Sequence, residues 1–183
     1  VVGGVPAKIG SIGDAMGLGI GYVPVDRLTE GLFLSQSIGR NIAVGSLDRV
    51  GAGAFIDART VNVEGQRWVD RLAIATPSAA LPVQSLSGGN QQRVVLARWL
   101  ATGPSILILN GPTVGVDVGS KADIHAAIAG LARDGLGVII ISDDIPEVLT
   151  SCHRVLVMKA GRIVDEVAHG EVGEDELTHR VAG

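Results

Sequence analysis

A short string, Leu86-Ser87-Gly88-Gly89-Asn90-Gln91, holds the residues whose types and spacing are best suited to chemistry. A serine and two glycines directly before a helix present a hydroxyl group and unblocked backbone N–H groups at the positive end of the helix dipole. That arrangement suits a phosphate group as ligand. The same three residues also form an ordinary turn that caps a helix, and taken alone they leave both interpretations open.

The sequence contains no phosphate-binding loop of its own. Such a loop needs several glycines followed by Gly-Lys-Ser/Thr, because its amides wrap the phosphates and its lysine neutralises their charge. The lysines at Lys8, Lys121 and Lys159 do not follow a glycine in this pattern. No spacing of His, Cys and carboxylate residues indicates a zinc site. We therefore expect the chain alone to bind neither a nucleotide nor a metal ion.

Apolar strands and amphipathic helices alternate around this string and must position it. Residues 105–109 and 137–142 are continuous apolar runs, which are typical of parallel strands covered on both faces. Residues 90–101 show the apolar spacing of a helix directly after the glycine turn. This alternation predicts an α/β fold with a mainly parallel sheet. The other elements expected are a strand at 19–24, a hairpin of strands at 154–158 and 161–164, and helices at 63–75, 120–133 (capped by Ser120), 146–150 and 174–181.

Composition narrows the functional classes. With 183 residues and 46% hydrophobic content, the chain is long enough for one core and too short for two comfortable domains. A net charge of -4 and 3% aromatic residues argue against a nucleic-acid partner. Cys152 is the single cysteine, which excludes a disulfide within the chain and favours a reducing compartment such as the cytosol. The apolar runs are far shorter than the ~20 residues that span a bilayer, so we expect membrane association through a partner.

The full string Leu86–Arg93, followed by a helix and a buried strand, closely resembles the signature motif of ABC ATPases. Its Asn-Gln-Gln form is particularly similar to that of the ribose, galactose and xylose importers. The resemblance covers nearly the whole chain and is strongest at 86–149. It implies a P-loop NTPase-like fold with a small helical subdomain at about residues 30–90 and an α/β core at 91–183. Residues 1–183 then correspond to part of a second cassette, without its first strands and its Walker A loop.

Four positions depart from the pattern of that family. Asn110 and Gly111 stand where the Walker B motif has an aspartate that holds Mg²⁺ through water and a glutamate that polarises the attacking water. Asparagine brings no charge to a cation, and glycine cannot act as a base. Asp143 stands at the position of a histidine that contacts the γ-phosphate, where its charge would repel the phosphate. Val25 stands at the Q-loop position, which usually holds glutamate or glutamine. The resemblance thus implies that this chain alone does not hydrolyse ATP.

The resemblance also implies a role on the nucleotide of another cassette. In ABC dimers the signature motif of one cassette completes the ATP site of the other, which assigns that role to Leu86, Ser87, Gly88, Gly89, Asn90 and Gln91. Asp117 matches the D-loop, which touches the opposite cassette. ATP and Mg²⁺ are then bound mainly by the partner cassette. Further implied partners are membrane permease subunits and, indirectly, a periplasmic or extracellular sugar-binding protein, with the cassette on the inner face of the cell membrane.

The sequence leaves open an import cassette that regained ATP binding through an N-terminal extension, and two other functions besides. One is a catalytically inert, truncated or degenerate cassette with a structural or regulatory role. A neighbouring reading frame for a complete cassette and a permease would favour transport over that alternative. The other is a DNA-repair or chromosome-structural ATPase, which shares a signature motif. It fits poorly, because those proteins interrupt the fold with long heptad arms and this sequence has none.

Overall fold

The computed structural model describes residues 1–46, 51–52 and 55–182. It divides into two compact units, Val1–Ile139 and Ile140–Gly183, and each is described by itself. In chain order the larger unit holds α1 (Ile12–Gly17), β1 (Ile20–Val23), η1 (Arg27–Gly31), α2 (Ile38–Ala43), η2 (Val44–Ser46), β2 (Gly51–Ala52), β3 (Phe55–Ile56), α4 (Ala58–Arg71), η3 (Val83–Ser85), α5 (Gly88–Ala101), β4 (Ile106–Asn110) and α6 (Val118–Arg133). The strand β5 (Gly137–Ile141) runs across the division, and α7 (Ile145–Ser151), β6 (Arg154–Lys159), β7 (Arg162–Ala168) and α8 (Glu174–Ala182) follow.

The central sheet has the strand order β1-β4-β5. The strands β1 and β4 run parallel, with Ile20 opposite Ile106 and Val23 opposite Leu109. Val23, Leu107 and Leu109 have no exposed surface, so the middle of the sheet is part of the core. The α/β fold with a parallel sheet, predicted from the alternation of elements, is confirmed.

The strand β5 differs from its prediction. The apolar run at 137–142 predicts a strand covered on both faces, yet Ile139 and Ile141 are 51% and 50% exposed. Among the described residues, β5 is the last strand of its sheet and has β4 as its one neighbour. A continuous apolar run indicates a strand, but the position of that strand in the sheet determines how much of its surface is buried.

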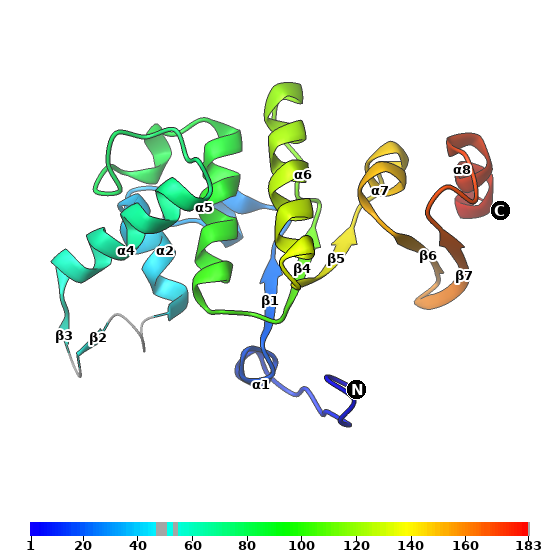
Figure 1. Ribbon diagram of the computed structural model, residues 1–183, viewed down its shortest axis with the longest axis horizontal. Helices are drawn as coiled ribbons and strands as arrows, with labels where there is room; N and C mark the ends of the chain where they lie inside the picture. The colour runs from blue at the N-terminus through cyan, green and yellow to red at the C-terminus, as the bar shows by residue number, and fades with distance from the viewer. Residues whose placement is uncertain (47–50, 53–54, 183) are drawn as a thin grey trace. The chain divides into compact units, whose positions relative to one another are not determined.

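Three helices of the larger unit, α2, α4 and α5, lie against one another (Figure 1). The helix α4 begins at Ala58 and ends at Arg71, earlier than the predicted range of 63–75. It begins there because the side chain of Asp57 accepts hydrogen bonds from the amides of Arg59 and Thr60, at 3.2 and 3.0 Å, which is typical of an N-cap. The polar residues of this first turn hide it from an argument based on apolar spacing alone.

The carboxamide of Asn41 joins α2 to α5 in the interior of this helical region. Asn41 is fully buried, and its Oδ1 accepts hydrogen bonds from the amide of Phe33 at 2.8 Å and from the guanidinium of Arg98 at 2.7 Å. Its Nδ2 donates to the carbonyl of Phe33 at 3.0 Å, and Arg98 Nε donates to the carbonyl of Asn41 at 2.7 Å. Burial lowers the pKa of Arg98 to about 10, so the guanidinium keeps its charge at neutral pH.

The smaller unit contains the β6–β7 hairpin and the helices α7 and α8. Its core consists of Val148, Val157, Val167 and Leu177. The hairpin predicted through Lys159-Ala160-Gly161 is confirmed, because Lys159 lies opposite Arg162 across a two-residue turn. Ala160 and Gly161 both have positive φ angles, 47° and 76°, as the tightest class of hairpin turn requires.

We predict that Asn41→Ala lowers the free energy of unfolding by about 2 kcal/mol or more, because the change leaves a buried amide and a buried guanidinium without their acceptor. Urea unfolding followed by circular dichroism measures the change. Asn62→Ala is the matched control, since Asn62 is exposed on α4, and we expect it to stay within about 0.5 kcal/mol of the wild type. Equal losses in the two variants would contradict a central role for the Asn41 hydrogen bonds.

Candidate functional site

The turn before α5 presents the predicted phosphate-contacting groups. Ser87 is the N-cap residue of α5 and is exposed, and Gly88 is the first residue of the helix. Amide groups in the first turn of a helix have no acceptor within that helix, and they point along its axis toward the N-terminus. The hydroxyl of Ser87 does not cap these amides. This turn therefore offers both a side-chain hydroxyl and backbone donors to an anion.

Two hydrogen bonds fix the hydroxyl of Ser87. The amide of Ala75 donates to Asn90 Oδ1 at 2.8 Å, which orients the carboxamide of Asn90. The Nδ2 of Asn90 in turn donates to Ser87 Oγ at 2.9 Å. Because the Ser87 oxygen is the acceptor in this bond, the hydroxyl keeps its own hydrogen for donation to a further acceptor. Asn90 thus acts within the turn by orienting Ser87.

The predicted signature residues divide between the surface and the interior. Gln91 is 8% exposed, and its Nε2 donates to the carbonyl of Val83 at 3.5 Å. Leu86 is partly buried where the chain passes from η3 to α5, and Gly89 is buried. Ser87 and the first amides of α5 are therefore the parts of this string that can touch a ligand, while the other residues anchor the helix.

The buried Gly89 allows α5 to approach α6 closely. A Cβ atom added to Gly89 would lie 2.5 Å from both Cβ and Oγ of Ser120. A Cβ atom essentially never lies that close to an atom of another residue, so a side chain at position 89 would push the two helices apart. The second glycine of the string is thus required by packing, independently of any ligand.

Asp117 is the N-cap residue of α6, directly before Val118. This corrects the expectation that Ser120 caps the helix. The carboxylate of Asp117 accepts hydrogen bonds from the amide of Ser120 at 3.0 Å and from its hydroxyl at 2.8 Å. These two bonds, the amide bond first, lower the pKa of Asp117 below its ordinary value. Ser120 lies three residues after the N-cap residue Asp117. It donates the two capping hydrogen bonds, and Asp117 accepts them.

The residues predicted to stand at the Walker B and Q-loop positions are brought together, but they form an apolar contact. Gly111 is buried with a φ of 56°, and an added Cβ atom would lie 2.8 Å from Val114 Cγ2 and 3.0 Å from Val25 Cγ2. The Nδ2 of Asn110 donates to the hydroxyl of Tyr22 at 3.1 Å. Valine methyl groups cannot ligate Mg²⁺, and the neutral carboxamide of Asn110 brings no negative charge to an ion that prefers carboxylate and water oxygens. The residues at these positions therefore do not fit a catalytic magnesium ion.

Asp143, at the position of the γ-phosphate histidine, belongs to the smaller unit and is exposed. Its neighbours form a local polar network, in which the hydroxyl of Ser142 donates to the carboxylate of Glu147 and Asp144 caps α7 by accepting from the amide of Glu147 at 3.1 Å. Within the described part of the chain, no three His, Cys, Asp or Glu side chains are grouped so that they could hold a metal ion.

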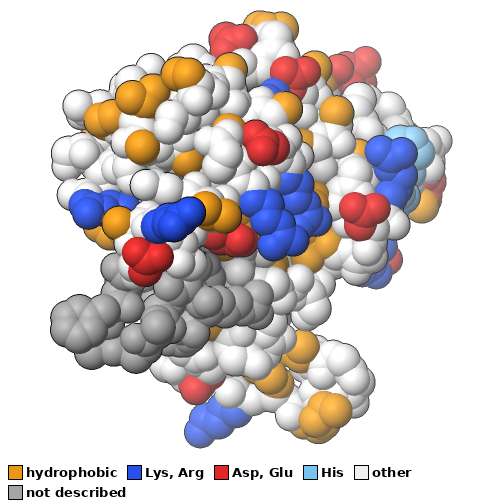
Figure 2. Space-filling model, turned by 60° about the vertical axis from the view of Figure 1, so that its left-hand side comes forward, with side chains coloured by type: hydrophobic (Ala, Val, Ile, Leu, Met, Phe, Trp, Pro, Cys, Tyr) orange, Lys and Arg blue, Asp and Glu red, His pale blue; other side chains and the backbone are white. Residues whose placement is uncertain are grey.

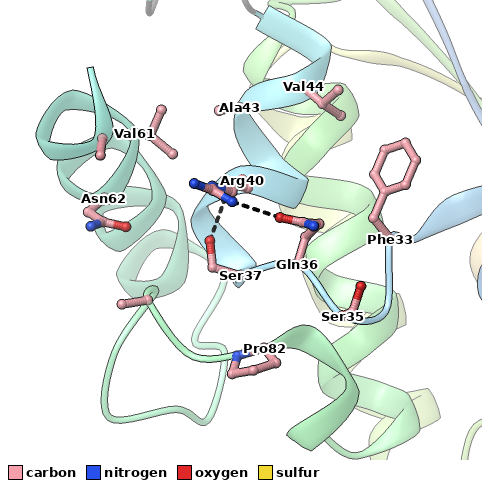
Figure 3. A pocket seen from close by; sticks show the side chains of 12 residues that line it. Phe33, Ser35, Gln36, Ser37, Arg40, Ala43, Val44, Val61, Asn62 and Pro82 are labelled. Atoms are coloured by element: carbon pink, nitrogen blue, oxygen red, sulfur yellow. Dashed lines mark hydrogen bonds between the residues drawn. The ribbon is translucent and has the colours of Figure 1, made fainter. Parts of the chain in front are cut away.

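A groove of about 780 Å³ opens beside α2 and α4, as Figure 3 shows. Its walls include Phe33, Ala43, Val61 and Pro82, with Arg40 as the charged residue. Arg40 NH1 donates to Gln36 Oε1 at 2.9 Å. The face drawn in Figure 2 carries basic and acidic side chains interspersed with hydrophobic ones. None of the described helices is long and apolar enough to cross a membrane.

Sequence analysis missed Tyr22, Ala75 and Asn41 as residues that organise the site. Tyr22 and Asn110 are separated by 88 positions, and Ala75 and Asn90 by 15. Neither contact produces a periodic pattern. The single local signal is an asparagine, Asn90, at the first turn of a predicted helix, where a short polar side chain is suited to bonds with nearby chain groups.

Comparison with known proteins points to one family. The family model of the ABC transporter matches residues 13–114, which is more than half of the chain. The chain is 42% identical over 180 residues to the putative ribose/galactose/methyl galactoside import ATP-binding protein 1 of Rhizobium etli, a match that covers 98% of this chain and 34% of that protein. It is 41% identical over 174 residues to the L-arabinose transport ATP-binding protein AraG of Geobacillus stearothermophilus, with 95% and 34% covered. The chain thus spans about a third of the length of these relatives.

The fold is also similar to that of solved ATP-binding cassettes. A crystal structure of a nucleotide-free ATP-binding cassette from an ABC transporter superposes with a TM-score of 0.72 at 20% identity. The match covers 93% of this chain and 67% of that cassette. At this level of identity the likeness concerns the fold.

We predict that Gly89→Ala lowers the free energy of unfolding by about 1 to 3 kcal/mol, because the new methyl group meets Ser120 at the α5–α6 contact. Gly119→Ala is the matched control, since a Cβ atom added to Gly119 would lie 3.4 Å from Asp117 Oδ1 and meet no closer atom. We expect that control to change stability by less than about 1 kcal/mol. Thermal unfolding of both variants measures the change in stability. A Gly89→Ala protein as stable as the control would refute the close contact.

We predict that Ser120→Ala raises the pKa of Asp117 part of the way to its ordinary value, because the hydroxyl bond is lost while the amide bond remains. The pKa of Asp117 is depressed in the folded chain, so its contribution to stability is present above the unfolded pKa and disappears as the pH falls through the folded one. Carboxyl-detected NMR titration measures the shift. Asp57, which accepts from the amide and the hydroxyl of Thr60 in the same way, is the internal control, and its pKa should not change.

Proposed function

We propose that this chain, which belongs to the ABC transporter family, is part of the ATP-binding cassette protein of a carbohydrate importer and acts through its signature turn on the nucleotide of a second cassette. The observation that carries the proposal is the contrast between two positions. Ser87 presents an oriented hydroxyl at the surface, whereas Gly111, at the hydrolytic position, packs against Val25 and Val114. One half of a shared ATP site is thus preserved and the other half is replaced by apolar groups.

A sugar is the proposed substrate because of the relatives. The proteins of Rhizobium etli and Geobacillus stearothermophilus are named for import of ribose, galactose and arabinose. We assign residues 30–90 to the helical subdomain and 91–183 to the α/β core of one partial cassette. The assignment agrees with the positions of α2 and α4 before α5 and of β4 after it.

In the proposed mechanism, the hydroxyl of Ser87 and the first amides of α5 donate hydrogen bonds to the terminal phosphate of ATP held by the partner. Such bonds to a charged acceptor contribute about 1.5 to 3 kcal/mol each, and they form when the two cassettes close. Asn90 contributes by holding the Ser87 oxygen as an acceptor, which directs the hydroxyl hydrogen outward. The signature turn therefore binds the partner cassette more tightly when that cassette holds ATP, so ATP binding favours association of the two cassettes.

The chain's own residues do not supply hydrolysis in this proposal. ATP with bound Mg²⁺ supplies the phosphoanhydride bond whose cleavage drives transport, and it is held mainly by the partner cassette. Gly111 has no side chain to activate water, and Asn110 uses its amide on Tyr22. Asp117 begins α6 with its carboxylate satisfied by Ser120, so we assign it a structural part in the loop that faces the partner.

The groove of Figure 3 is the surface that we assign to the membrane permease. It begins at Phe33, directly after the stretch that contains Val25, and its apolar walls suit the apolar face of a short helix. Arg40 at the groove would pair with an acidic residue of that helix. The protein then sits at the inner face of the cell membrane through this contact, with a sugar-binding protein coupled through the permease and no nucleic-acid partner.

The decisive experiment is calorimetric titration of Mg-ATP into three samples: the chain, a separate cassette that carries its own phosphate-binding loop, and their mixture. We expect no binding to the chain alone and tighter binding in the mixture than in the separate cassette. Ser87→Ala should weaken the binding in the mixture by about tenfold or more, because it removes a hydrogen bond to a charged group.

Ser85→Ala is the matched control, because Ser85 is an exposed serine that donates to the carbonyl of Pro82 and lies outside the signature turn. It should leave the affinity unchanged. A mixture that binds no better than the separate cassette would favour the alternative, a catalytically inert cassette with a structural or regulatory role. Binding by the chain alone would refute the assignment of ATP to the partner.

A further inference from the structure

The guanidinium of Arg27 joins three loops that the proposed function uses. Arg27 is the first residue of η1, two positions after Val25. Its NH1 donates to the carbonyl of Val114 at 2.9 Å, and its NH2 donates to the carbonyl of Gly115 at 2.9 Å. These two carbonyls belong to the loop that leads from β4 to Asp117. A fork of two donors on two successive carbonyls fixes both the position and the orientation of that loop.

The same guanidinium lies against the signature turn. A Cβ atom added to Gly88 would lie 2.9 Å from Arg27 NH2 and 3.3 Å from the carbonyl oxygen of Gly115. A Cβ atom added to Gly115 would lie 3.2 Å from Arg27 NH1. Gly88 and Gly115 therefore both leave the room that the guanidinium fills. A side chain at position 88 would therefore require the guanidinium of Arg27 to move.

The backbone that carries Arg27 is fixed by an N-cap, while one donor of its guanidinium has no partner within the described part of the chain. Asp26 caps η1 by accepting from the amides of Leu28 and Thr29, at 2.9 and 3.2 Å, and this fixes the backbone from which Arg27 extends. At the other end, the Nε of Arg27 is buried and has no hydrogen-bond partner within the described part of the chain. An unpartnered buried donor is a cost to stability, so the arrangement favours the placement of the two loops over the number of hydrogen bonds.

We infer that Arg27 is a positioning residue that sets the spacing between the signature turn at Ser87 and the loop ending at Asp117. This inference rests on the proposed function, because it assigns the fixed spacing to the surface that meets a second cassette. We assign Arg27 no role as a ligand of the nucleotide, because NH1 and NH2 both donate to loop carbonyls. It acts by keeping Gly88 and Gly115 at the separation that a single guanidinium fills, so that both loops are presented together.

Hydrogen exchange measured by NMR tests the contact in the chain alone. The amides of Val114 and Val116 donate to the carbonyls of Gly111 and Thr113 within the loop. In Arg27→Met we expect these two amides to exchange about tenfold faster or more, because the loop loses both of its hydrogen bonds to the guanidinium. Arg27→Lys should give an intermediate increase, since an ammonium group cannot reproduce the fork. Unchanged exchange in both variants, or an equal increase at every amide, would overturn the inference.

Arg67→Met is the matched control, because Arg67 is an exposed arginine of the same unit whose ion pair goes to Glu64 on α4. It should leave the exchange of Val114 and Val116 at the wild-type rate. A second test is a double-mutant cycle between positions 27 and 88. Gly88→Ala should accelerate exchange in the Arg27 protein and much less in Arg27→Met, where the guanidinium that the methyl group meets is gone. Equal effects in both backgrounds would contradict the contact.

The functional half of the inference is tested with Mg-ATP and the mixture of cassettes. Arg27→Met should weaken the mixture's affinity about tenfold, and Arg27→Lys should restore part of it, while Arg67→Met has no effect. Wild-type affinity in Arg27→Met would overturn the positioning role. If the wild-type mixture itself shows no gain in binding, the proposed function fails, and the exchange rates of Val114 and Val116 still decide whether Arg27 holds the two loops.

Discussion

The carboxamide of Asn41 and the guanidinium of Arg98 meet where α2, α5 and the chain at Phe33 converge. Asn41 is fully buried, so each of its hydrogen bonds must be made within the protein. The two partners of its Oδ1 come from different elements, and neither can be replaced by water. This pair therefore fixes the direction of α5 relative to α2, and with it the wall of the groove that begins at Phe33.

The helix α5 is held at both ends, and this is why its first turn can serve as a rigid donor surface. Arg98 anchors the last turns, while Gly89 brings the first turn against Ser120 of α6. Between these points, the buried faces of the helix include Val94, Val95 and Leu96, which have no exposed surface. A hydroxyl group on such a support needs little reorganisation when an anion arrives, because its orientation is set by Asn90 before binding.

The apolar surroundings of Gly111 follow from its backbone conformation. Gly111 has a φ of 56°, a conformation that a residue with a side chain rarely adopts, and Val25 and Val114 occupy the space where such a side chain would begin. A carboxylate at position 111 would have to displace both valines. A glutamate introduced at position 111 would therefore require Val25 and Val114 to move.

The sequence by itself determined the signature string, the helix that follows it, the parallel strand β4 and the β6–β7 hairpin, because each depends on local spacing, caps and turn residues. It also identified Asn110, Gly111, Val25 and Asp143 as departures from a known pattern. Only the tertiary structure decided that β5 is half exposed, that Asp117 rather than Ser120 caps α6, and that Arg27 spans the loops at Gly88 and Gly115. The physical reason is that these features arise where segments distant in the chain share the same space, and periodicity along a sequence records which face of an element is apolar but not which loop will lie against it.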